Sequence, residues 1–421
     1  MTELKAPTLK DDCFSLPLGV NWTPVDEALA YLRAALECVC AVETVAVADA
    51  IGRILAKDHL AVRSNPPAAN SAVDGYGFAF AAIPSGGNAV PLVVGRAAAG
   101  APYDGRVPEG AAIRILTGAV LPEGVDTVVL EEDCNTSDTE VAFEKPKRAG
   151  ANARKAGEDV EAGSVAFSKG TKLRSVDLAL LSALGLSEVQ VFRQLRVGVI
   201  STGDELVAPG ATLDPAKTYD ANRPMLLSMV ARLGYEALDL GHVGDDRDVL
   251  RSALDEMATQ VDVLLTSGGA SAGDEDHMSA LLNEAGAMQM WRIALKPGRP
   301  LALGLWQGVP VFGLPGNPVA AFVTALVFAV PACGILAGKS WKTPQGFQVP
   351  AAFEKRKKAG RREYLRARMT DEGTVEVFAS EGSGRISGLT WADGLVELSD
   401  EAQHVRPGDL VRFLPYGSFG L

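Results

Sequence analysis

The residues best suited to chemistry in this sequence lie in one stretch, at 261–276. It begins with VDVLL at 261–265, a run of apolar side chains typical of a buried strand. The next residues, TSGG at 266–269, contain glycines, which permit positive φ and a close approach of the backbone to a ligand. The acids DED follow at 274–276, directly before a helical pattern. A glycine-rich loop between a strand and a helix is a typical phosphate-binding site in open α/β sheets, and its acids suit a cation such as Mg²⁺.

Other polar loops of the same region have comparable chemistry. STGDEL at 201–206 follows a predicted strand, YDANR at 219–223 opens a helix, and GLPGNP at 313–318 precedes another helix. The carboxyl ends of parallel strands gather on one edge of a sheet, so the loops that follow strands are expected to lie together. Each loop alone is also compatible with ordinary turn chemistry. Several of them on one edge predict a ligand crevice.

A basic loop, KPGRP at 296–300, is stiffened by its prolines. Arg299 could hold an oxyanion by two parallel hydrogen bonds and Lys296 as a point charge, although a solvated basic turn is the alternative. The four histidines show no metal-binding spacing. His277, beside Asp276, is the only one expected near a ligand.

The elements that must position these loops alternate between strand and helix patterns across residues 195–338. This alternation predicts a doubly wound, mostly parallel sheet with helices on both faces. Strands are predicted at 197–201, 236–240, 261–266, 288–295, 300–305 and 309–313, and helices at 223–233, 247–259, 276–285 and from 318.

The rest of the chain predicts further domains around this α/β domain. Residues 1–62 and 148–194 are predicted to form an N-terminal region, which contains a helix from Thr23 to about Cys40. Residues 63–147 read as short strands punctuated by glycine and proline, which predicts an inserted β-barrel-like domain. Residues 339–421 return to short strands and predict a small C-terminal β domain.

Composition excludes several classes of protein. The chain has 40 basic and 52 acidic residues and a formal charge of −12, so nucleic acid is not expected as a partner. The uncharged stretch at 319–338 contains Pro331 and predicts a buried core helix rather than a membrane span. The five scattered cysteines are typical of reduced thiols in a cytoplasmic protein, and the N-terminus lacks a signal-peptide pattern. A P-loop motif and a GxGxxG motif after a strand are both missing, so neither a P-loop nucleotidase nor a Rossmann dehydrogenase is predicted.

Taken together, the motifs resemble the molybdopterin molybdenumtransferase (MoeA) family, to which the E domain of gephyrin-type proteins is related. The matching segments run in the family's order over most of the chain. They are NSAVDGYGF at 70–78, RILTGAVLPEGVDTVV at 114–129, NARKAGEDV at 152–160, STGDEL at 201–206, YDANR at 219–223, TSGGASAGDED at 266–276, KPGRP at 296–300 and GLPGNPVA at 313–320.

The resemblance implies a reaction and its participants. Adenylylated molybdopterin and molybdate would be the substrates, Mg²⁺ the cofactor, and molybdenum cofactor and AMP the products. The protein would be a cytoplasmic homodimer, for which residues 1–62 and 148–194 form an elongated dimerisation domain. Asp74 and Thr117 of one copy would approach the active site of the other. Its further partners would be a molybdopterin adenylyltransferase and proteins that mature molybdoenzymes.

The resemblance also assigns roles to individual residues. The acids would hold Mg²⁺ or position water for cleavage of the phosphoanhydride, and the loops would bind the substrates. The catalytic set is Glu205, Asp276, Asp245, Asp74 and Thr117, and the metal ligands are Glu205, Asp274 and Asp276. The binding set is Thr202, Gly203, Asp220, Asn222, Ser267, Gly268, Gly269, Lys296, Arg299, Pro315, Gly316, Asn317 and Pro318. Arg299 stands where the family often has a second lysine, which keeps the charge and changes the geometry.

Three alternative functions remain open at this point. The protein could be a molybdopterin adenylyltransferase, because the α/β domain is shared with those enzymes, although the additional terminal regions argue against it. A non-catalytic, gephyrin-like scaffold is the second alternative, and the retained acids argue against a purely structural role. A homologue that inserts tungstate is the third, and the sequence does not distinguish it.

Overall fold

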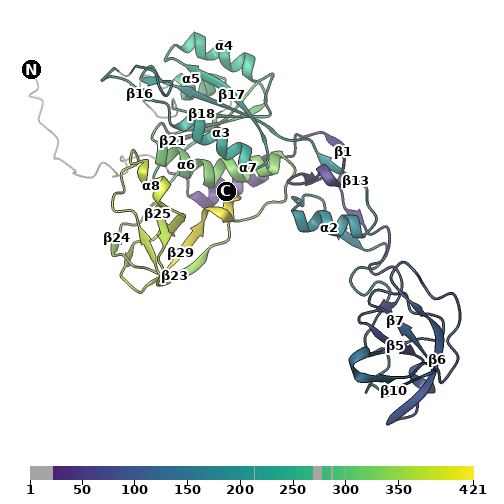
Figure 1. Cartoon of the computed structure of the whole chain (residues 1–421). Helices are drawn as coiled ribbons and strands as arrows, with labels where there is room; N and C mark the ends of the chain where they lie inside the picture. Colours follow the sequence, from purple (N-terminus) through teal and green to yellow (C-terminus); the bar gives the residue numbers. More distant parts are fainter. Residues whose placement is uncertain (1–21, 213, 269–276, 286–287, 299) are drawn as a thin grey trace, which may run out of the picture. The chain divides into compact units, whose positions relative to one another are not determined.

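The computed structural model describes residues 22–212, 214–268, 277–285, 288–298 and 300–421. The chain forms two compact units, one from Met1–Ala41 with Phe192–Leu421 and the other from Val42–Val191 (Figure 1). Contacts therefore divide the chain into two units rather than four domains, and the four domain limits given above remain predictions from sequence.

The second unit contains the predicted β-rich insertion. The insertion is a mixed six-stranded sheet that forms a half-barrel, with β8 and β9 at its edges and only β6 and β7 parallel. Its strands run in the order β8 (Thr127–Leu130), β5 (Gly75–Phe78), β7 (Ala112–Ile115), β6 (Gly87–Ala97), β10 (Glu140–Glu144) and β9 (Cys134–Thr136). Aromatic and branched side chains alternate inward, and Phe78 and Phe143 stack at the centre of the core.

The remainder of the second unit is a smaller layer beside the insertion. Helix α2 (Ser175–Ala183) packs through Leu181 on a core that includes Leu55, Leu173 and Val191. The strands of this layer are β1 (Val42–Ala46), β13 (Glu188–Phe192) and β2 (Ile54–Leu55) in one sheet, and the pairs β3 (His59–Leu60) with β12 (Val165–Phe167) and β4 (Asn70–Ser71) with β11 (Ala153–Arg154).

The first unit is built around a six-stranded sheet that confirms the predicted α/β domain. Its order is β17 (Glu236–Val243), β14 (Arg196–Thr202), β18 (Val263–Ser267), β22 (Val309–Leu314), β21 (Pro300–Trp306) and β19 (Met288–Arg292). The first four strands are parallel and the last two are antiparallel, so the sheet is mixed. From β14 the chain passes to β17 on one side and then to β18 on the other, which makes the gap between β14 and β18 a topological switch point.

Helices cover both faces of this sheet (Figure 1). Helices α4 (Arg247–Met257) and α5 (His277–Glu284) pack on one face through Leu254, Met278 and their neighbours. Helix α3 (Asn222–Arg232) covers β14 and β17 on the other face, beside α6 (Pro318–Thr324). The strand predicted at 288–295 is wrong at its end, because Leu295 belongs to a different sheet.

That other sheet forms the C-terminal β domain. Its order is β20 (Leu295–Lys296), β25 (Arg362–Met369), β27 (Gly394–Leu398), β29 (Leu410–Pro415) and β23 (Phe347–Pro350), with β26 (Val375–Val377) paired to β25. Strand β24 (Lys355–Lys357) pairs separately with β28 (Gln403–Val405), and α8 is Ser387–Trp391. The basic loop at 296–298 therefore leaves an edge strand of this sheet.

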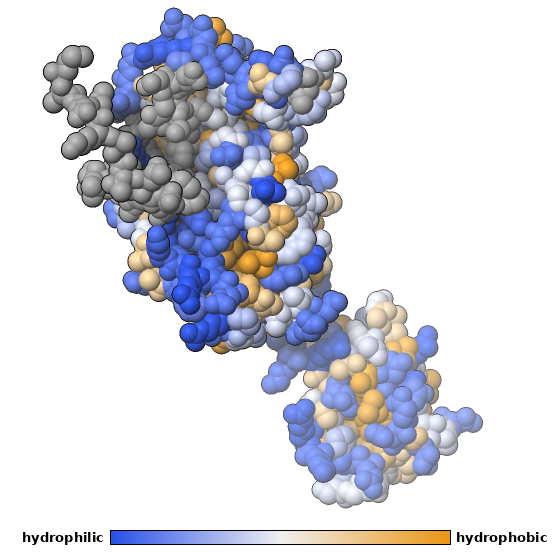
Figure 2. Space-filling model, turned by 90° about the vertical axis from the view of Figure 1, so that its left-hand side faces the viewer, coloured by the Kyte–Doolittle hydropathy of each residue, from blue (hydrophilic) through white to orange (hydrophobic). Residues whose placement is uncertain are grey.

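Helix α1 (Val25–Ala35) ends five residues before the predicted limit at Cys40. The apolar helix Pro318–Leu336 comprises α6, a π-helical turn and α7 (Val330–Leu336). By length and composition alone it could cross a membrane. However, 78% of its apolar window is buried, as expected for a core helix. The surface visible in Figure 2 is largely hydrophilic, with scattered hydrophobic patches.

The amino ends of β14 and β18 are joined by one buried carboxylate, Asp262. Its Oδ2 accepts a hydrogen bond of 2.7 Å from Arg193 Nη1, and its Oδ1 accepts one of 2.9 Å from Arg196 Nη2. Burial alone would raise the pKa of Asp262, but the hydrogen bonds from both arginines outweigh it and lower the pKa to about 2. The carboxylate therefore stabilises the fold at neutral pH.

Replacing Asp262 with asparagine is expected to lower the free energy of unfolding of the first unit by about 2 kcal/mol at pH 7. The pKa is depressed in the folded state, so this stabilisation is complete above the usual value of 3.8 and is lost as the pH falls toward about 2. Urea unfolding of both proteins, followed by tryptophan fluorescence, measures the difference. A difference that stays constant down to pH 2.5 would contradict this account.

Candidate active site

The carboxyl ends of β14 and β18 meet at the switch point. Gly268, which directly follows β18, has φ of +95°, and a Cβ placed on it would lie 2.5 Å from the carbonyl oxygen of Thr202. Its N–H donates to the carbonyl of Leu314 at the end of β22, at 3.2 Å. The structure thus brings three strand ends together, and glycine is required at the point of closest approach.

Asn222, at the start of α3, ties two of the candidate loops together. Its Nδ2 donates to Ser267 Oγ at 2.7 Å and to the carbonyl of Gly316 at 2.6 Å. Asn222 and Ser267 are both buried. Three residues predicted to bind the substrate therefore contact one another, although they lie far apart in the sequence.

Several buried polar atoms at this edge lack a hydrogen-bond partner within the described part of the chain. A cluster of such atoms is rare in proteins and is explained by a polar ligand or by ordered water. They are Ser201 Oγ and Thr202 Oγ1 on β14, Thr266 Oγ1 on β18 and Asn222 Oδ1 on α3.

Two acids form a reciprocal pair beside the same strand ends. The N–H of Asp204 donates to Asp245 Oδ2 at 3.0 Å, and the N–H of Asp245 donates to Asp204 Oδ1 at 3.0 Å. Glu205 is exposed, and its carboxylate lies over Gly203, where an added Cβ would approach Glu205 Oε2 to 2.3 Å. Three carboxylates therefore emerge from the loops that follow β14 and β17.

The donor set fits a magnesium ion. The described residues contain no group of three or more metal-binding side chains, and Asp274 and Asp276 lie outside them. Magnesium typically takes one or two carboxylates and completes its shell with water and substrate phosphate. Asp245 and Glu205 can supply those carboxylates from the described part of the chain.

Other predicted site residues lie elsewhere or are already hydrogen-bonded. The buried carboxylate of Asp220 accepts from the N–H and Nε of Arg223, both at 3.1 Å, and thus holds the first turn of α3. Lys296 Nζ lies 2.6 Å from Glu381 and 3.5 Å from Glu363, so its charge is balanced within the C-terminal domain. Gly269 and Arg299 lie outside the described residues.

The C-terminal domain approaches the start of α6 through a loop at 380–385. The carbonyl of Ser383 accepts a hydrogen bond from the N–H of Val319 at 3.1 Å. The buried Arg366 holds this loop by donating to the carbonyl of Arg385 at 2.6 Å. Sequence reasoning did not assign this loop or Arg366 to the site. The predicted GLPGNP loop, which includes Pro315 and Gly316, ends at the start of α6. Asn317 is the N-cap of this helix and Pro318 is its first residue.

The second unit brings together Asp74 and Thr117, which are 43 residues apart. The N–H and the hydroxyl of Thr117 donate to Asp74 Oδ1 at 2.6 and 2.7 Å. Both hydrogen bonds lower the pKa of the exposed Asp74 carboxyl, and the one from the Thr117 hydroxyl has the larger effect. A nearby part of the same unit encloses a polar cavity of about 490 Å³ that Asn70 and Arg154 line, and sequence reasoning did not assign these two residues a role.

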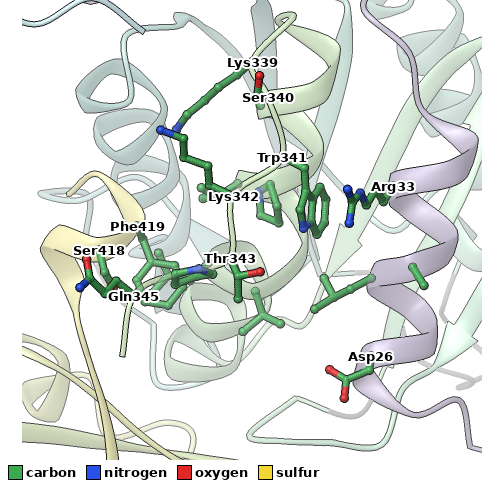
Figure 3. Close-up of a pocket in the computed structure, with 18 of the residues that line it drawn as sticks. Asp26, Arg33, Lys339, Ser340, Trp341, Lys342, Thr343, Gln345, Ser418 and Phe419 are labelled. Carbon is green, nitrogen blue, oxygen red and sulfur yellow. The ribbon is translucent and has the colours of Figure 1, made fainter. Parts of the chain in front are cut away.

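A larger cavity, of about 1040 Å³, lies apart from the strand ends (Figure 3). Its walls come from α1, the apolar helix at 318–336 and the segment at 339–345, and include Trp341 and Phe419. Its acid, Asp26, is held by Arg362 at 2.7 and 2.8 Å. The cavity contains none of the predicted site residues, so size does not identify the active site.

The fold and the strand-end loops define a class of protein, in which a doubly wound α/β domain with a polar site at its switch point lies in the sequence between an N-terminal region and a C-terminal β domain. Family models match in that order. They describe the MoeA N-terminal region (domain I and II) at residues 23–185, a probable molybdopterin binding domain at 198–334 and the MoeA C-terminal region (domain IV) at 348–416. The chain belongs to the molybdopterin molybdenumtransferase family, which confirms the resemblance seen in the sequence.

Individual relatives support this assignment. The molybdopterin molybdenumtransferase of Haemophilus influenzae is 35% identical over 87% of this chain and 92% of its own length. That of Synechococcus elongatus is 34% identical over 83% of this chain and 88% of its own. The crystal structure of the molybdopterin biosynthesis MoeA protein from Pyrococcus horikoshii superposes with a TM-score of 0.81, at 27% identity, over 94% of this chain and 100% of that one.

Proposed function

We propose that the protein inserts molybdate into adenylylated molybdopterin in a Mg²⁺-dependent reaction that forms molybdenum cofactor and releases AMP. The observation that carries this proposal is the reciprocal Asp204–Asp245 pair beside the switch point of the sheet. Its carboxylates lie on the loops that follow β14 and β17, where Gly203, Gly268 and buried polar atoms without a partner in the described part of the chain also lie. Such a site suits a phosphorylated substrate together with a divalent cation.

The residues divide the work between binding and cleavage. Gly268 and Gly203 would allow the backbone to approach the phosphates, and the unpartnered buried hydroxyl of Thr202 would offer a hydrogen bond to them. The hydroxyl of Ser267 accepts from Asn222 and would donate its own proton to the same group. When bound, Mg²⁺ would neutralise charge on the phosphoanhydride as it is cleaved. Asp245 and Glu205, with Asp274 and Asp276, would hold that ion and position water.

The proposed reaction also needs a binding site for the oxyanion and partner proteins. Lys296 and Arg299 would bind molybdate, and Lys296 would exchange its ion pairs with Glu381 and Glu363 for the oxyanion. Two copies would form a cytoplasmic homodimer, in which the Asp74–Thr117 pair of one copy completes the site of the other. A molybdopterin adenylyltransferase would supply the adenylylated substrate, and molybdoenzyme maturation proteins would receive the product.

The alternative functions are less well supported. An adenylyltransferase would not need the N-terminal and C-terminal regions, both of which match the molybdenumtransferase family models. A pure scaffold would not need the converging acids of the crevice. A preference for tungstate over molybdate is decided by measuring the reaction with each oxyanion.

The metal requirement gives a direct test of the proposed reaction. Purified protein mixed with adenylylated molybdopterin, molybdate and Mg²⁺ is expected to release AMP, measured by chromatography. Removal of Mg²⁺ with EDTA should reduce the rate roughly 100-fold or more, because charge on the phosphoanhydride is then not neutralised. Excess Mg²⁺ should restore it. Substrate that binds without any release of AMP would disprove the enzymatic proposal.

A further inference from the structure

Two histidine side chains brace the loops that carry the Asp204–Asp245 pair. His277, the first residue of α5, has its Nε2 3.0 Å from the carbonyl oxygen of Asp245. His242, near the end of β17, has its Nε2 2.7 Å from the carbonyl oxygen of Gly203. His277 is partly buried, whereas His242 is exposed. Each histidine thus binds the main chain of one of the two loops.

A carbonyl oxygen only accepts hydrogen bonds, so the Nε2 atom of each ring must carry a proton. This assigns both Nε2 donors to the backbone, so these two nitrogen atoms are not available as bases or metal ligands. Both contacts are made to the main chain of the loops. They fix the positions of two carbonyl groups, and through them the carboxylates on the same loops.

His242 and His277 contact two loops that are hydrogen-bonded to each other. Asp204 and Asp245 exchange hydrogen bonds between side chain and main chain, so a shift of either loop moves both carboxylates. Lys217 adds a further contact, from its Nζ to the carbonyl of Asp204 at 2.5 Å.

We infer that His277 and His242 are positioning residues that hold the acidic pair in its metal-binding arrangement. The inference rests on the proposed function, because it assigns that arrangement a role in the reaction. Partners behind metal-binding groups typically change metal affinity or activity about 10–100-fold when replaced. A displacement of about 1 Å at a reacting centre has a comparable cost.

Substitutions at His277 test the inference through the position of the donor. Glutamine places an amide N–H close to the position of Nε2, whereas asparagine is one bond shorter and does not reach the Asp245 carbonyl. We expect His277→Asn to lower kcat for AMP release about 10–100-fold with a smaller change in KM, and His277→Gln to stay within about threefold of wild type. Equal rates for the two variants, whether low or unchanged, would overturn the inference.

Metal affinity provides a readout that does not require turnover. Titration calorimetry with Mn²⁺ on the full-length chain is expected to show affinity about 10-fold weaker for His277→Asn and close to wild type for His277→Gln. His404→Asn is the matched control, because His404 pairs with Glu354 in the C-terminal domain, and it should leave the affinity unchanged.

The two measurements separate the inference from the proposed function. The wild-type protein could release no AMP while the Mn²⁺ affinity is weakened by His277→Asn and retained by His277→Gln. This result would disprove the proposed function and support the positioning role. A wild-type protein that turns over, with a glutamine variant no better than the asparagine variant in rate or affinity, would disprove the positioning role alone.

Discussion

Replacing Gly268 with alanine is expected to reduce AMP release about 100-fold or more, because the crevice cannot keep its shape. The new Cβ would lie 2.5 Å from the carbonyl oxygen of Thr202, a backbone atom that cannot move aside without shifting β14. The φ of +95° adds strain for any side chain. Displacement of the Thr202 loop would in turn displace Asp204 and Glu205, which follow it directly.

A second glycine provides a control that separates the effect of the steric contact from the effect of backbone strain. Gly210 has a similar φ, +89°, but a Cβ placed on it meets no atom within 4 Å. Gly210→Ala should therefore show only the modest strain of its φ and retain most of the activity. Initial rates of AMP release, with circular dichroism to verify folding, compare the two variants. If Gly268→Ala and Gly210→Ala were equally active, close approach at the switch point would not be needed.

The sequence allowed the architecture and the neighbourhood of the crevice to be predicted. Alternation of strands and helices requires a wound sheet, and parallel strands have their carboxyl ends on one edge. The meeting of Thr202, Ser267 and Gly316 follows from that rule without knowledge of any side-chain contact. The roles assigned to these residues remain predictions.

Long-range pairing accounts for most of what the sequence did not reveal. The partner of Lys296, Glu381, lies 85 residues away in the sequence. Strand β20 joins the C-terminal sheet because Leu295 and Lys296 pair with Arg362 and Glu363, a choice that no local pattern encodes. The same holds for His242, which the sequence could not connect with Gly203, because the parallel register of β14 and β17 creates that contact.

The reciprocal acidic pair shows a second limit of sequence reasoning. Asp204 and Asp245 are separated by 41 residues, and each acts both as a side-chain acceptor and as a main-chain donor. In the sequence they are two separate acids in two separate loops. The structure shows that they form one unit, so a change at either position is expected to affect both loops.

Mixing two inactive variants is expected to restore activity if the proposed homodimer shares its active sites. Glu205→Gln disables a residue of the first unit, and Asp74→Asn disables one of the second unit. Each variant alone should release AMP near background. After subunit exchange, about half of the dimers are mixed and each carries one intact site, so about a quarter of the wild-type rate should return.

The recovery depends on which copy supplies each residue. If one copy supplied both Glu205 and Asp74 to a site, no mixed dimer would contain an intact site and the rate would stay at background. Mixing Glu205→Gln with Asp245→Asn is the matched control, because both residues belong to the first unit and no arrangement of copies restores a site. Recovery in the first mixture without recovery in the control would assign the Asp74–Thr117 pair to the neighbouring copy, and equal rates in the two mixtures would refute the shared site.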